Sequence, residues 1–355
     1  MTKDDRFVRD FFSDILEEET SKKSYLYFHP GGIHDYYVRK KPKQLRYLSD
    51  TIAGQGFKRK MAAGLFRRLS FLPGLLQALP RINGVNLKVG DTTTPDLIIT
   101  SKVFRLISKE VGVVHTVSPN HPEKVLKEIE ARTSLPTEIP TPDLYQVDRS
   151  IPYYTEEFID GRIVGPPTKA WSKYCCVYQH LSSLYKKTVQ EPRSTQSTIN
   201  RVLNDLRDEP VDSSWIEQIE YKLHKHEMPD RLRKCKIHGD LNERNILIRD
   251  GNLYLIDWEG YRTGYPMYDL FRPFLIQYYD TRDTSPFHRL LNHSENGPQW
   301  GSDVGEIIGP IMYDSKDWFP GLLLLTMVQA LTYLTTNSPL WECTHEILDD
   351  ISQYP

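Results

Sequence analysis

The sequence has few cysteines, and its charges of opposite sign nearly balance. The cysteines include no C-x-x-C pair and no spacing typical of metal ligands; they are Cys175, Cys176, Cys235 and Cys343. This pattern argues against a disulfide framework and favours a reducing compartment, so we expect a cytoplasmic protein. The formal net charge of −2 gives no reason to expect a nucleic-acid partner.

The sequence also lacks an apolar segment suited to secretion or to crossing a membrane. Residues 1–6 are mainly polar and do not predict a signal peptide. The longest apolar run, 319–334, is interrupted by Pro320, Thr326 and Gln329, so we expect a buried helix there. With 355 residues, of which 39% are hydrophobic and 26% charged, the chain can bury a large core in two lobes and an additional segment.

The most specific pattern present is His-Gly-Asp at 238–240, followed by Asn245 and then by Asp257. An Asp at the head of such a loop can accept the proton of a hydroxyl, and an Asn five residues later can ligate Mg²⁺ through its carbonyl oxygen. The turn signal Asp-Gly-Asn at 250–252 predicts a hairpin that returns the chain, so that Asp257 can ligate the same metal. The spacing therefore predicts a phosphoryl-transfer centre that uses ATP and Mg²⁺, with Asn245 and Asp257 as metal ligands.

These motifs resemble those of the aminoglycoside phosphotransferase and choline kinase family, protein-kinase-like enzymes that act on small molecules. Gly239 carries much of the resemblance, because protein kinases usually have Arg at this position. The stretch 264–270 is similar to the family's next element, Gly-x-Pro-x-x-Asp-Leu, in which Asp269 is structural. The resemblance implies that Asp240 and Asn245 are catalytic, and that His238 and Asp269 brace the catalytic loop.

The resemblance extends to two elements upstream of the catalytic loop. The run 153–161 is similar to the hinge between two lobes, whose backbone groups hydrogen-bond adenine. The residues expected to bind the nucleotide there are Glu157, Phe158 and Ile159. A helix that begins near Pro122 would be the helix that carries an ion-pairing carboxylate, with Glu128 as first candidate and Glu130 as the alternative.

The fold class implied is α+β, a protein-kinase-like fold with a small β-rich N-lobe, a larger and mainly helical C-lobe, and an N-terminal extension. We expect the extension at 1–84, the N-lobe and hinge at 85–160, and the C-lobe with the acceptor pocket at 161–355. Runs rich in Val, Ile and Tyr predict the strands of the N-lobe, at 96–100, 103–107, 111–117, 144–147 and 153–159.

The chain departs from the family where the nucleotide phosphates would bind. The strand before the helix has His115 or Thr116 where the family has a lysine, and no G-x-G-x-x-G run is present. Residues 90–94 or 100–102 would have to serve as the phosphate loop. Lys102 or Arg105 would then supply the missing positive charge, and we take Lys102 as the candidate cofactor-binding residue.

Residues 1–84 resemble no kinase element. They predict a short helix at 5–19, a strand at 24–29 and a basic amphipathic stretch that includes 56–76. We interpret the basic stretch as a helix docked on the N-lobe with a solvated basic face. A peripheral membrane contact is the alternative that we do not favour.

The sequence therefore predicts an ATP- and Mg²⁺-dependent kinase whose partner is a small hydroxylated acceptor, such as a sugar, an aminoglycoside or an amino alcohol. The competing hypothesis is a pseudokinase that binds a nucleotide or a partner protein, because the lysine and the glycine loop are missing. Phosphorylation of protein side chains ranks last, since the chain lacks the Ala-Pro-Glu segment and an activation loop after Asp257.

Overall fold

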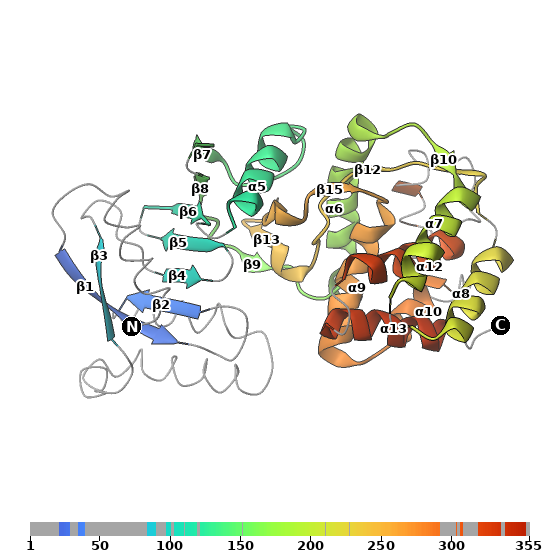
Figure 1. The fold of residues 1–355 in the computed structure, drawn as a ribbon. Helices are drawn as coiled ribbons and strands as arrows, with labels where there is room; N and C mark the ends of the chain where they lie inside the picture. The colour runs from blue at the N-terminus through green and yellow to red at the C-terminus, as the bar shows by residue number, and fades with distance from the viewer. Residues whose placement is uncertain are drawn as a thin grey trace. The chain divides into compact units, whose positions relative to one another are not determined.

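The structure of the chain is a computed structural model (Figure 1). It describes the strand backbones within 21–39 and 84–100 and, with short gaps, residues 103–291, 303–307 and 319–352. The backbone divides into two compact units. The N-terminal unit comprises Met1–Ile129 and Pro142–Asp160, and the C-terminal unit comprises Glu130–Thr141 and Gly161–Pro355.

The N-terminal unit is built on an eight-stranded antiparallel sheet with the order β3-β1-β2-β4-β5-β6-β8-β7. Its strands are β1 (Ser21–Phe28), β2 (Asp35–Arg39), β3 (Gly84–Val89), β4 (Leu97–Thr100), β5 (Phe104–Ser108), β6 (Val113–Val117), β7 (Leu144–Asp148) and β8 (Tyr153–Glu157). The five strands expected between 96 and 159 are all present, as β4 to β8. β6 begins two residues later than expected, because Gly112 has a φ of +74° and its N–H donates to Ser108 O in a turn.

Two strands of the region expected as an extension belong to this same sheet. The strand expected at 24–29 is present as β1, which pairs with β2 on one side and with β3 on the other. The helix expected at 5–19 and the basic stretch 56–76 lie outside the described residues.

Helix α5 (Pro122–Ser134) packs one apolar face onto the sheet of the N-terminal unit. Val125 and Ile129 are fully buried and cluster with Val103 and Tyr154. Leu126, next to Val125, is 38% exposed. The buried residues Val125 and Ile129 are four positions apart on one face of the helix, so Leu126 lies at the edge of that face.

The C-terminal unit is mainly helical (Figure 1). Its described helices are α6 (Pro167–Thr188), α7 (Thr195–Arg207), α8 (Ser213–Lys225), α9 (Met267–Thr281), α10 (Ser285–Leu291), α12 (Phe319–Tyr333) and α13 (Pro339–Ser352). The aromatic stripe of α6 is core, with Tyr174, Tyr178 and Tyr185 fully buried. The mixed α+β architecture, with a β-rich N-terminal and a helical C-terminal unit, is as the sequence predicts.

The apolar run near the C-terminus forms helix α12, whose residues from Leu322 to Leu331 are buried in the core of the C-terminal unit. Its burial explains why it is apolar on all sides. Among the helices that the structure describes, none has the length and hydropathy needed to span a membrane.

Candidate active site

Short paired strands position the loop that carries the catalytic motif. Strand β12 (Cys235–Ile237) leads into the loop and pairs with β15 (Arg262–Gly264). The next strands, β13 (Ile246–Arg249) and β14 (Asn252–Leu255), form the expected hairpin, and β13 also pairs with β9 (Arg162–Ile163). Asp250 and Gly251 both have positive φ, 52° and 83°, as a tight two-residue hairpin turn requires. The loop 238–245 and Asp257 therefore follow strands held at fixed register.

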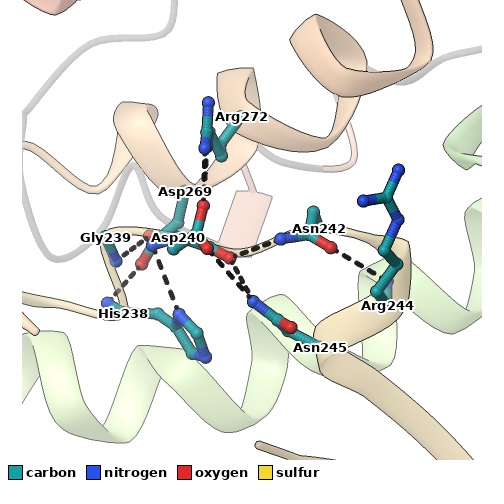
Figure 2. Close-up of polar contacts among 8 residues, drawn as sticks. All are labelled: His238, Gly239, Asp240, Asn242, Arg244, Asn245, Asp269 and Arg272. Carbon is teal, nitrogen blue, oxygen red and sulfur yellow. Dashed lines mark hydrogen bonds and ion pairs between the residues drawn. The ribbon is translucent and has the colours of Figure 1, made fainter. Parts of the chain in front are cut away.

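Asp240 and Asn245 lie against each other within the loop (Figure 2). The Asn245 side-chain amide donates to the backbone oxygen of Asp240 at 2.8 Å and to its carboxylate Oδ2 at 3.4 Å. Asn242 adds a second donor to the same backbone oxygen at 2.9 Å, and its own side-chain oxygen accepts from the N–H of Arg244. The side-chain nitrogen of Asn245 is thus used inside the loop, which leaves its side-chain oxygen Oδ1 for a metal.

Gly239 has a steric reason for being glycine. Its φ is +79°, and a Cβ added there would stand 2.0 Å from the carbonyl oxygen of Gly260. A Cβ on Gly260 would in turn stand 2.8 Å from Asp240 N and from Gly239 C. The loop and the segment after Asp257 thus meet backbone to backbone. The resemblance drew attention to Gly239, whereas the sequence analysis missed its partner Gly260.

His238 connects the catalytic loop to the segment that carries Asp257. Its Nε2 lies 3.1 Å from the backbone oxygen of Ile256, and since a carbonyl only accepts, Nε2 carries the proton. Its Nδ1 accepts, at 3.4 Å, from the N–H of Asp240. The fully buried Trp258 packs against the His238 ring with centroids 4.4 Å apart. One imidazole thus touches the backbone beside both acidic residues.

Asp269, in the first turn of α9, holds the backbone of the same loop (Figure 2). Its carboxylate accepts from Gly239 N at 2.8 Å and His238 N at 2.9 Å, and from the Tyr185 hydroxyl at 3.0 Å. Burial raises the pKa of the Asp269 carboxyl, while the hydrogen bonds that it accepts act in the opposite direction. Asp269 has no exposed surface, and its hydrogen bonds tie the loop backbone to α9.

Arg272, one turn along α9 from Asp269, contacts the carboxylate of Asp240 (Figure 2). Its Nε and Nη2 donate to Asp240 Oδ1 at 2.9 and 2.7 Å. Burial alone would lower the pKa of Arg272, but the Asp240 carboxylate and Tyr268 together outweigh this effect, so the pKa is raised. The sequence analysis missed this residue. The sequence could have indicated it, because Arg272 is a charged residue three positions after Asp269 and so lies on the same face of the helix.

The two expected metal ligands suit Mg²⁺ by their chemistry. Both Asn245 and Asp257 offer oxygen atoms, and the hydrogen bond from Ile256 N to Asn245 O, 3.0 Å, links their two segments. Asp257 has a φ of +63°, a left-handed conformation that costs about 1–2 kcal/mol and that recurs at functional sites. Within the described parts of the chain, no three His, Cys, Asp or Glu side chains gather as a metal site.

In the N-terminal unit, Glu128 forms an ion pair with Arg105 of β5, with Nη2 and Oε2 3.7 Å apart. Glu128 is 1% exposed, whereas the alternative Glu130 is exposed. Arg105 lies directly opposite Thr116 in the β5–β6 ladder, so these two side chains share one face of the sheet. His115 lies on the other face and contacts the Tyr153 hydroxyl at 2.9 Å. Lys102 lies outside the described residues.

The expected adenine-binding run follows β8 in the same unit. The N–H of Glu157 donates to Asp143 O and the N–H of Phe158 to Gly112 O, both at 2.8 Å. These two donors are therefore used by the protein. The Ile159 N–H makes no such bond to the described residues.

Comparison with known proteins identifies the class of site. Residues 187–303, which include the whole catalytic loop, Asp257 and Arg272, match the model of the phosphotransferase enzyme family APH. The predicted resemblance to this family is confirmed over that segment. No curated protein matches the sequence.

Solved structures of kinases are similar to the chain at low identity. A choline/ethanolamine kinase family protein from Mesorhizobium loti is 14% identical, with 72% of this chain and 84% of that chain covered and a TM-score of 0.39. Choline kinase LicA from Streptococcus pneumoniae is 15% identical, with 72% and 91% covered and a TM-score of 0.45. A thermostable mutant of aminoglycoside phosphotransferase APH(4)-Ia, solved with AMP-PNP and hygromycin B, is 13% identical, with 71% and 89% covered and a TM-score of 0.45.

Proposed function

We propose that this protein is a kinase that transfers the terminal phosphate of ATP to a hydroxyl group of a small molecule. The observation that carries the proposal is the juxtaposition of Asp240 and Asn245 in one loop, joined through His238 and Ile256 to the segment of Asp257. These are the residue types that phosphoryl transfer needs to orient a hydroxyl and to hold a metal. All five residues lie in the segment that matches the phosphotransferase family.

In the proposed reaction, the acceptor hydroxyl donates a hydrogen bond to the Asp240 carboxylate. The acceptor oxygen attacks the terminal phosphorus, the new O–P bond forms as the bond to the leaving ADP oxygen breaks, and the hydroxyl proton passes to Asp240 and then to water. Asn245 and Asp257 would hold Mg²⁺, which neutralises phosphate charge when bound. His238 and Asp269 keep the Asp240 loop in place.

We further propose that Arg105 supplies the cation for the nucleotide phosphates. Its ion pair with the buried Glu128 fixes the guanidinium, and it faces Thr116, one of the two candidate positions for the family's lysine. The backbone N–H of Ile159 would then bind the base. A cytoplasmic location suits the four free cysteines.

The acceptor would be a sugar, an aminoglycoside or an amino alcohol. The alternative is a pseudokinase that binds nucleotide without transferring phosphate. The absence of a lysine on β6, which has His115 and Thr116 at the two candidate positions, favours this alternative.

The test is Mg²⁺-dependent phosphate transfer from ATP to pooled sugars, aminoglycosides and amino alcohols. Asp240→Asn keeps the shape of the side chain and removes its charge, and we expect a loss of about 10²–10⁴-fold in rate. Asp250→Asn, the same change on the exposed hairpin turn, is the matched control and should leave the rate unchanged. Nucleotide binding without transfer by the wild type would favour the pseudokinase, and absence of both would reject either function.

A further inference from the structure

We infer that Arg272 is a positioning residue for the Asp240 carboxylate. It binds Oδ1 of that carboxylate, so that Oδ2 faces the acceptor hydroxyl. The inference rests on the proposed function and adds to it a residue that the catalytic motif does not contain. It is carried by contacts among residues of the C-terminal unit alone.

The two oxygens of Asp240 have unequal surroundings. Oδ1 accepts two charge-assisted hydrogen bonds from the Arg272 fork, at 2.9 and 2.7 Å. Oδ2 accepts one weak contact from Asn245 at 3.4 Å, which is at the limit for a hydrogen bond. Because Oδ1 is occupied by strong donors, Oδ2 is the oxygen with capacity for a further donor.

The position of Arg272 in the fold makes this arrangement rigid. Asp269 and Arg272 are three residues apart on α9, and they hold the backbone of Gly239 and the side chain of Asp240 respectively. The Arg272 side chain is only 12% exposed, whereas that of Asp240 is 28% exposed. A largely buried cation therefore orients a carboxylate that remains accessible, which is the arrangement expected when one partner supports and the other reacts.

Arginine is suited to this task in a way that lysine is not. Its planar fork places two donors on one oxygen in a fixed geometry, whereas an ammonium acts as a point charge. The proposal therefore predicts graded losses. With the acceptor identified under the proposed function, Arg272→Lys should lower kcat about 10-fold and Arg272→Met about 100-fold, with KM for ATP within about twofold.

Three comparisons separate positioning from a merely structural role. Arg282→Met removes an exposed ion pair with Glu346 from the other end of α9 and should leave kcat unchanged. In an Asp240→Asn background, Arg272→Met should cause no further loss, because Arg272 acts through that carboxylate. The loss in Arg272→Met should also fall on kcat and not on KM for ATP, a split that a general loss of structure would not produce.

The deciding experiment measures these rates together with the ¹³C carboxyl signal of Asp240, assigned from its loss in Asp240→Asn. At a fixed pH of 7, we expect the chemical shift of that signal to change in Arg272→Met and to stay unchanged in Arg282→Met. An unchanged chemical shift in Arg272→Met, or an additive rate loss in the double variant, would overturn the inference. A changed chemical shift in a protein that transfers no phosphate to any acceptor would support the Arg272–Asp240 pairing and reject the proposed function instead.

Discussion

Replacing Gly239 with alanine should damage the catalytic loop through two separable effects. The residue has a φ of +79°, where an L-residue other than glycine costs about 1–2 kcal/mol. The new methyl group would also stand 2.0 Å from Gly260 O and 2.8 Å from Gly260 C, so backbone must move, and such overpacking costs about 1–3 kcal/mol. We therefore expect the free energy of unfolding to fall by roughly 2–5 kcal/mol, the sum of these ranges.

The chain offers a matched control for each effect. Gly251 has a similar φ, +83°, but nothing lies within 4 Å of an added Cβ, so Gly251→Ala isolates the conformational cost. Gly260 has no positive φ, but its Cβ would stand 2.8 Å from Asp240 N, so Gly260→Ala isolates the steric cost. Gly239→Ala should thus be the most destabilising of the three.

Denaturant unfolding of the three variants and the wild type measures the stability differences, and the rate of phosphate transfer measures the consequence for Asp240. Gly251→Ala should keep the wild-type rate, whereas Gly239→Ala and Gly260→Ala should reduce it about 100-fold, because both displace the Asp240 backbone. Equal stability of Gly239→Ala and Gly251→Ala would show that the contact with Gly260 has no energetic effect, and would refute the reasoning.

Two further predictions concern charged side chains. Arg105→Met and Glu128→Gln should each weaken ATP binding about 10-fold in a calorimetric titration, because they remove the proposed phosphate cation or its buried anchor. The control Lys109→Met, which removes an exposed ion pair with Asp160, should leave ATP binding unchanged. Burial and neighbouring arginines lower the pKa of Lys234 from 10.5 to about 8, so its half-buried charge destabilises the fold at neutral pH, and this cost disappears as the pH rises from about 8 to 10.5. Lys234→Met should therefore raise the free energy of unfolding at pH 7, measured by denaturant unfolding, by roughly 1 kcal/mol; this value allows for the partial exposure of the side chain. If Lys234→Met were no more stable than the control Lys236→Met, the prediction would be contradicted.

The sequence predicts local features of this protein better than contacts between distant segments. The strands β4 to β8, helix α5 and the β13–β14 hairpin follow from residue patterns only a few positions long, such as the turn at 250–252. The same holds for the order of Asp240, Asn245 and Asp257. These elements are specified by neighbours along the chain, so their existence can be predicted and only their boundaries shift.

The contacts that complete the site join residues far apart in sequence. Arg272 reaches Asp240 across 32 positions, and Tyr185 reaches Asp269 across 84. No periodicity encodes such pairs, because they depend on where helices α6 and α9 pack. The sequence could indicate that α9 carries a charged residue on the same face as Asp269, but not which carboxylate it would meet.

The proposed role of Arg105 would account for the missing lysine by a change of strand. Of the two residues at the expected position on β6, Thr116 shares a face with Arg105, and Tyr154, the register partner of Thr116 on β8, packs with α5. His115 points to the opposite face, and burial lowers its pKa, which makes it a poor permanent cation. A guanidinium on β5 can therefore meet the carboxylate on α5 from the strand next to the usual one. Glu128 is almost fully buried, and burying a carboxylate is costly unless a cation faces it. The Arg105–Glu128 pair therefore provides the fixed cation that the proposed phosphate site requires.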